Sequence, residues 1–145
     1  PDPMSLPEAK ERQMAYTDRL SLRAPYTPQS FYDGAKECPG TRQKDIRRNI
    51  KKRTQQRLDD TPTLAWDDGG VRVSGQSDET LELKLVNYLS GDANETEMVN
   101  PVTNVESLGL WMGDAEAFSV SCTSSCAVLL QEQDSGVVIA VKSRP

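Results

Sequence analysis

The fold class follows from residues 61–88, which read TPTLAWDDGGVRVSGQSDETLELKLVNY. Two apolar stretches, 64–66 and 71–73, flank the turn-forming residues 67–70, and this arrangement predicts a β-hairpin. Leucines then alternate with charged residues over 80–88, and a period of two predicts a half-buried strand. Antiparallel β-structure is therefore expected to dominate this part of the chain.

Further short apolar segments follow toward the C-terminus. Residues 90–107 are polar and predict a long loop, and residues 108–113 predict another strand. The segments 118–122, 126–131 and 137–142 are separated by short turn sequences, which favours an antiparallel meander.

In the other direction, residues 41–60 (TRQKDIRRNIKKRTQQRLDD) predict a helix. Pro39-Gly40 interrupts the chain before it, Thr41 can cap it, and Pro62 marks its end because the residue before a proline avoids the helical region. Its apolar residues form one narrow stripe, made of Ile46, Ile50 and Leu58. We expect one edge of this helix to pack and the rest to face water or a partner.

Residues 1–40 contain six of the nine prolines, which predicts an extended N-terminal arm with room for one short helix between residues 7 and 22. Three aromatic residues, Tyr26, Phe31 and Tyr32, either pin this arm to the domain or dock a partner. The favoured interpretation is that they pin the arm.

The expected architecture is α+β. An antiparallel sheet of five or six strands carries one packed basic helix, and the extended arm precedes a single domain over residues 41–145. A small β-sandwich or barrel is the alternative.

Charge is segregated along the chain. Residues 41–60 contain eight basic and three acidic side chains, a net charge of +5, whereas residues 61–145 contain four basic and 13 acidic ones, a net charge of −9. The whole chain of 145 residues carries −5. The predicted helix is thus a basic element of an acidic protein.

Three interpretations of this basic helix compete. A charge run is most often a solvated face. The helix could instead meet an acidic protein surface, where complementary charge sets orientation and encounter rate. It could also contact nucleic-acid phosphates, although the acidic remainder of the chain would repel the same polyanion.

A membrane role fits less well. The basic helix lacks the wide apolar face of a membrane-surface helix, and no segment approaches the roughly 20 apolar residues of a membrane span. We therefore expect no membrane insertion. The first residues lack the apolar core of a signal peptide, so any export signal is expected to have been removed or never present.

The absence of histidine excludes several chemistries. Without it there is no Ser–His or Cys–His nucleophile pair and no HExxH zinc motif. The phosphate-binding sequences GxxxxGK[ST] and GxGxxG are absent as well. The acidic residues at 67–68 and 92–97 are better explained as a turn and a loop than as cation sites. We expect no catalytic residues, no metal and no cofactor.

Cys122 and Cys126 flank three small polar residues. If those residues form a hairpin loop, the two cysteines lie opposite each other and can form a disulfide after slight adjustment. The alternative is a pair of small buried thiols. An oxidised pair would indicate an extracytoplasmic compartment; otherwise localisation stays open. Cys38 is expected to be an unpaired thiol in the arm, with a bridge to one of the other cysteines as the alternative.

The sequence favours a non-catalytic protein-interaction or assembly module in which the basic helix and the aromatic, proline-rich arm dock a protein partner. The candidate partner-binding residues are Arg47, Arg48, Lys51, Lys52 and Arg53 in the helix and Tyr26, Phe31 and Tyr32 in the arm. The alternative is a nucleic-acid-binding accessory protein that places the same helix on phosphates. The sequence assigns no oligomeric state.

Overall fold

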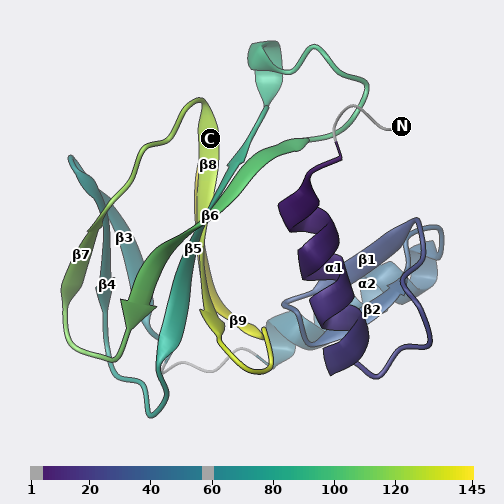
Figure 1. Cartoon of the computed structure of the whole chain (residues 1–145), viewed down its shortest axis with the longest axis horizontal. Helices are drawn as coiled ribbons and strands as arrows, with labels where there is room; N and C mark the ends of the chain where they lie inside the picture. Colours follow the sequence, from purple (N-terminus) through teal and green to yellow (C-terminus); the bar gives the residue numbers. More distant parts are fainter. Residues whose placement is uncertain (1–4, 57–60) are drawn as a thin grey trace.

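The computed structural model describes residues 5–56 and 61–145 (Figure 1). The helices are α1 (Pro7–Arg19), α2 (Gln43–Gln55) and the short 3₁₀ helix η1 (Gly91–Ala93). The strands are β1 (Gln29–Tyr32), β2 (Lys36–Pro39), β3 (Thr63–Asp67), β4 (Gly70–Ser74), β5 (Leu81–Tyr88), β6 (Val102–Trp111), β7 (Glu116–Ser119), β8 (Ser125–Glu132) and β9 (Val138–Arg144). All strand pairs are antiparallel, and the α+β class is confirmed.

The strands form three sheets in place of the predicted sheet of five or six strands. They are the β1–β2 hairpin, the three-stranded sheet β3-β4-β7 and the four-stranded sheet β6-β5-β8-β9. The two larger sheets enclose one hydrophobic core, in which Val71 and Val73 of β4 meet Leu83 and Leu85 of β5 and Trp111 of β6. The alternative prediction of a small β-sandwich therefore describes residues 61–145.

The predicted hairpin and the alternating strand are confirmed. β3 and β4 pair across the turn at Asp67 and Gly70. In β5 the residues facing the core are buried and those between them are half-buried, as the period of two requires. The predicted loop over 90–107 is too long, because β6 already begins at Val102 and pairs with β5.

The predicted meander is wrong at its first strand. β7 pairs with β4, so Phe118 lies beside Val71, while β8 pairs with β5 and β9. The chain thus leaves one sheet after Ser119 and enters the other at Ser125. A hairpin and a crossover between facing sheets give the same local pattern, because each places alternate residues in the core.

Residues 5–40 of the predicted extended arm fold as a helix and a hairpin, and the short helix expected between residues 7 and 22 is confirmed as α1. Pro7 occupies the first turn of α1, where its missing N–H is not needed, and Glu8 and Arg19 suit the two ends of the helix dipole. Together with α2, these elements form what we call the N-terminal module, residues 5–56.

The predicted basic helix exists but is shorter than residues 41–60. α2 begins at Gln43, after an N-cap at Arg42 that makes no side-chain capping hydrogen bond, so Thr41 is not the cap. It ends at Gln55. The last four residues of the predicted helix, including Leu58 of the apolar stripe, lie outside the described residues.

The N-terminal module contacts the sandwich mainly at the β8–β9 turn. The Tyr16 hydroxyl donates to the Gly136 carbonyl oxygen at 2.8 Å, and the Val138 amide donates to the Asp33 carbonyl oxygen at 2.7 Å. α1 stands between the four-stranded sheet and the β1–β2 hairpin, and α2 lies on the far side of that hairpin (Figure 1). None of the helices in the described part of the chain has the length and apolar character needed to cross a membrane.

Candidate interaction surface

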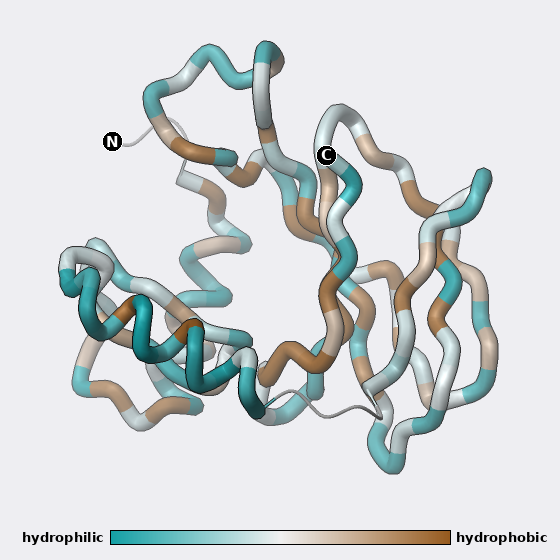
Figure 2. Tube along the Cα trace, turned by 180° about the vertical axis from the view of Figure 1, so that it is seen from behind, coloured by the Kyte–Doolittle hydropathy of each residue, from teal (hydrophilic) through white to brown (hydrophobic). Residues whose placement is uncertain are grey.

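The basic face of α2 is the most strongly charged surface of the N-terminal module. At 100° per residue, its basic residues occupy an arc of about 140° of the helix. They are Lys44, Arg47, Arg48, Lys51 and Lys52, and all five are exposed. Ile46 and Arg53 lie on the opposite side, half-buried against the hairpin. Figure 2 shows α2 as a mostly hydrophilic element at the periphery of the molecule.

Ion pairs within the helix neutralise only part of this face. Asp45 accepts from Arg48 and lies 3.9 Å from Arg42. Lys44, Arg47, Lys51 and Lys52 form no ion pair with any described residue. Four like charges on one helix repel one another, and an acidic partner would relieve that repulsion.

Arg53 differs from the other candidate helix residues. Its Nε donates to Asp33 Oδ2 at 3.1 Å, and the two side chains are 24% and 21% exposed. This pair links α2 to the turn that follows β1, since it joins residues 20 positions apart. Arg53 therefore positions the helix, and the free basic face consists of the four unpaired cations.

A shallow hollow of about 210 Å³ adjoins this face. Phe31, Tyr32, Ile50 and Thr54 line it together with the Asp33–Arg53 pair. Ile50 is 53% exposed although it belongs to the apolar stripe of α2. The surface thus combines free cations with an apolar depression, the two features that position and anchor a protein ligand.

The aromatic residues proposed as partner contacts are largely used within the module. Tyr32 is 8% exposed, and its hydroxyl lies 3.3 Å from the sulfur of Cys38. Burial, and then this contact with Cys38, raise the pKa of Tyr32 above its ordinary value. Phe31 packs against Tyr16 with ring centroids 5.0 Å apart, and its half-buried side chain also lines the hollow.

Tyr26 is tied to the hairpin by its hydroxyl, which donates to the Glu37 carboxylate. Its carbonyl oxygen accepts from Gln13 Nε2 at 3.0 Å, which joins this segment to α1. Burial and the neighbouring Glu37 raise the pKa of Tyr26 to about 12. Tyr26 therefore pins the segment before β1 to the module.

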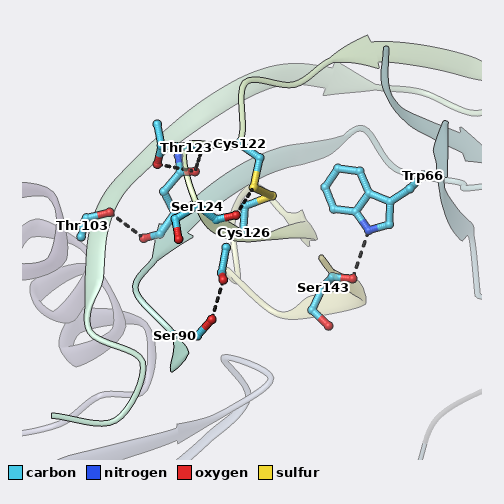
Figure 3. The surroundings of a disulfide bond; sticks show 10 residues. Trp66, Ser90, Thr103, Cys122, Thr123, Ser124, Cys126 and Ser143 are labelled. Carbon is cyan, nitrogen blue, oxygen red and sulfur yellow. Dashed lines mark hydrogen bonds between the residues drawn. A yellow bond between two sulfur atoms is a disulfide. The ribbon is translucent and has the colours of Figure 1, made fainter. Parts of the chain in front are cut away.

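Cys122 and Cys126 form a disulfide with Cα atoms 5.7 Å apart (Figure 3). It does not close a hairpin, because Cys122 lies in the crossover between the sheets and Cys126 belongs to β8. The Thr123 amide donates to Asn87 Oδ1 at 3.3 Å and fixes the same crossover. Cys38 is a free, buried thiol in β2, so the alternative bridge from Cys38 is not formed.

Within residues 5–56 and 61–145, no group of three Cys, Asp or Glu side chains is placed to hold a metal ion. The charged contacts found there are short-range ion pairs, such as Lys84 with Glu82 at 3.5 Å.

The basic run of α2 was predicted from the sequence, whereas the ion pair and the hollow beside it were not. The Asp33–Arg53 pair and the hollow beside Phe31 depend on the hairpin lying against α2, a contact between segments about 20 residues apart. The exposed Ile50 in a basic helix was the one local sign of an apolar site there.

Comparisons with known proteins agree with this fold and assign no activity. A crystal structure of protein AGR_C_4864 from Agrobacterium tumefaciens superposes with a TM-score of 0.75 and 19% sequence identity, over 98% of this chain and 72% of that one. At that identity the likeness shows the fold alone. No curated protein matches the sequence. The family described as "Protein of unknown function (DUF1223)" matches residues 1–142, and the chain therefore belongs to that family.

Proposed function

We propose that this protein is a non-catalytic interaction module that docks an acidic protein partner on α2. The observation that carries the proposal is the face of four exposed cations without an ion-pair partner among the described residues, beside an apolar hollow. The cations would steer and orient the partner, and an apolar side chain of the partner would enter the hollow at Ile50.

The aromatic segment has a supporting role in this proposal. Tyr26 and Tyr32 hold the hairpin on which α2 lies, and Arg53 fixes the helix to it through Asp33. Direct contacts would come from Arg47, Lys51 and Lys52, with Arg48 sharing its charge with Asp45. Phe31 would contribute the edge of its ring.

A defined probe tests this before any partner is known. The probe is a fluorescent peptide rich in glutamate with one central leucine, compared with single- and double-stranded oligonucleotides at about 50 and about 200 mM salt. We expect the wild-type protein to bind the peptide, and the double variant R47E/K51E to lose at least about tenfold in affinity, because two attractions become repulsions. The fluorescence anisotropy of the labelled peptide measures the affinity of the wild type and of the double variant.

The matched control reverses two exposed cations of the sandwich, Arg72 and Lys142, to glutamate. This variant has the same net charge as R47E/K51E and should bind the peptide like the wild type. Equal losses of peptide affinity in the two variants would mean that the peptide responds to the net charge of the protein and not to the basic face of α2. If R47E/K51E melts at a much lower temperature than the wild type, the two cations are needed for stability, and the loss of binding does not assign them to a partner.

The oligonucleotide arm separates the alternative function. Tight oligonucleotide binding that collapses between the two salt concentrations, without peptide binding, would assign α2 to phosphates in place of protein. No binding of either probe at the low salt would remove both functions from this helix.

We also propose that the protein works in an oxidising compartment. The Cys122–Cys126 disulfide supports this, because cytosolic reductants keep most thiols reduced. The protein would be alkylated rapidly in native cells and its mass measured. We expect one alkylated cysteine, Cys38, and two cysteines that the disulfide protects from alkylation. Three alkylated cysteines would contradict the assignment.

A further inference from the structure

A second surface, to which α2 contributes no lining residue, lies where the N-terminal module meets the outer face of the four-stranded sheet. It is a groove of about 400 Å³ between α1, Phe31 and that sheet. Sites for small molecules commonly measure about 300–1,000 Å³ and favour junctions between structural units. A groove of this size fits a small molecule and is too small for a helix or a folded partner.

The sheet contributes an apolar floor on a face that is turned away from the sandwich core. Val86 lies beside Val105 in the β5–β6 register, and Leu129 lies beside Val141 in the β8–β9 register. All four side chains line the groove, and Val141 is 45% exposed. Further along the same face, β5 carries Glu82 and Lys84, so its apolar residues on this face do not extend beyond the groove in that direction.

One wall of the groove carries a cation with spare hydrogen-bond donors. Arg12 Nη2 donates to Tyr16 Oη at 3.0 Å and to Gln131 Oε1 at 2.9 Å, which holds the guanidinium in place. Arg12 is half-buried and forms no ion pair with a described residue. Its Nη1 and Nε form no hydrogen bond with a described residue, and a guanidinium can hold a carboxylate through two parallel hydrogen bonds.

Arg12 also lines a neighbouring polar cavity, which contains Glu8, Glu11, Glu82 and Glu106. None of these carboxylates lies within ion-pair distance of Arg12. Arg19 and Lys84 line the same cavity, and the four carboxylates outnumber these two cations. A ligand carboxylate is therefore expected on the groove side of the guanidinium, with the hydrocarbon part over the valines.

We propose that this groove binds a small amphipathic carboxylate, with its carboxylate on Arg12 and its hydrocarbon part on Val86, Val105, Leu129 and Val141. The volume, the apolar floor and the unpaired guanidinium each point to this ligand class. The groove shares Phe31 and Asp33 with the hollow beside α2. Arg12 and the four apolar residues of the floor do not line that hollow, so variants of these residues test the groove separately from the interaction function.

The test uses octanoate, octanol and octylammonium, which share one hydrocarbon chain and differ in charge. Methyl NMR spectra of the full chain report on the groove valines, with the core valines Val71 and Val73 as an internal reference. We expect saturable shifts at Val86, Val105 and Val141 on addition of octanoate, and none at the two core valines. Octanol should bind about tenfold more weakly, because it gains no charged hydrogen bond, and octylammonium more weakly still.

Two variants and their controls assign the contacts. R12Q should weaken octanoate binding about tenfold and leave octanol binding unchanged, whereas R12K should retain a preference for octanoate. R72Q, which removes an exposed arginine on the other sheet, should leave octanoate binding unchanged. V141Q should weaken both ligands, and V99Q, at a valine that is 89% exposed and outside the groove, should affect neither.

Three outcomes would overturn the proposal while the protein remains folded in its spectra. The first is an absence of saturable octanoate shifts at the groove valines. The second is binding of octanol or octylammonium that is as tight as that of octanoate. The third is octanoate binding that R12Q and V141Q leave unchanged.

Discussion

At the scale of single residues, Tyr26 should titrate at higher pH than a free tyrosine. Burial and the adjacent Glu37 both disfavour the tyrosinate, and together they raise the pKa of Tyr26 to about 12. In E37Q the charge is removed and the burial remains, so we expect the pKa to fall and to stay above 10, its ordinary value. Absorbance at 295 nm, with Y26F to identify the transition, measures this.

The same shift makes stability depend on alkaline pH. The folded state holds the Tyr26 proton more tightly than the unfolded state, so this contribution is complete below pH 10 and is lost as pH rises through about 12. Urea unfolding at several pH values should show a steeper loss in the wild type than in Y26F. Equal slopes for the two proteins would contradict the assignment.

Gly34 is a second position where one residue decides the structure. Its φ is +66°, and an added Cβ would overlap the Gly136 carbonyl oxygen, the atom that accepts from Tyr16. We expect G34A to lower the free energy of unfolding by about 2–4 kcal/mol, since the left-handed conformation and the overlap both cost energy. Chemical denaturation measures the loss.

Gly69 provides the matched control for G34A. A Cβ on Gly69 meets no atom within 4 Å. G69A should therefore change stability by less than about 1 kcal/mol, the size of ordinary effects at exposed sites. Similar losses of unfolding free energy in G34A and G69A would show that the packing of Gly34 against Gly136 does not explain the effect of G34A.

At the scale of elements, the disulfide is expected to stabilise the protein only modestly. Cys122 and Cys126 are four positions apart, and closing so short a loop removes about 2 kcal/mol of unfolded-state entropy in the chain-entropy model. We expect C122A to lower the free energy of unfolding by no more than about that amount. Denaturation of C122A and of the reduced wild type should give similar midpoints.

A much larger loss of unfolding free energy in C122A would show that the disulfide stabilises the crossover by more than the loop entropy explains. Cys126 is left in place in this variant because it is fully buried, and replacing it would add a cavity to the core. The hydrogen bond from Thr123 to Asn87 should hold the crossover when the disulfide is open.

The elements that could be predicted were those with a local signal. The leucines of β5 and the turn between β3 and β4 determine their own conformation, so both were confirmed. The partner of β7 could not be predicted, because its alternation fits either sheet. The short helix expected between residues 7 and 22 is confirmed as α1, with a proline in its first turn. The β1–β2 hairpin was not predicted, because the prolines of this segment favoured an extended arm.

In the candidate site, too, only the features with a local sequence signal could be predicted. Local composition identified the basic run, but which cations are free depends on Asp45 within the helix and on Asp33 across the module. The groove on the sheet was not predicted at all. Val86, Val105, Leu129 and Val141 come from four strands, and only their register places them on one face.

At the scale of the whole molecule, the junction between the N-terminal module and the sandwich rests on few contacts. Tyr16 is central to it: the ring is buried, the hydroxyl donates to Gly136, and it accepts from Arg12. The other hydrogen bonds between described residues of the two parts are those of Val138 with Asp33, of Arg12 with Gln131 at 2.9 Å and of Arg19 with the Gln133 carbonyl at 2.9 Å. The sandwich has its own core, so the module should be the part that opens first.

The variant Y16F tests this hierarchy. It removes one hydroxyl and leaves the Gly136 carbonyl without its buried donor, which should cost about 1–3 kcal/mol. In native-state hydrogen exchange, we expect amides of α1 and the β1–β2 hairpin to lose more protection than those of β5 and β8. The control Y88F removes the same atom from a tyrosine whose hydroxyl bonds to no described residue, and should change neither set. Equal loss of protection in both parts of Y16F would mean that module and sandwich unfold as one cooperative unit, because a purely local opening cannot lower the protection of the sandwich core.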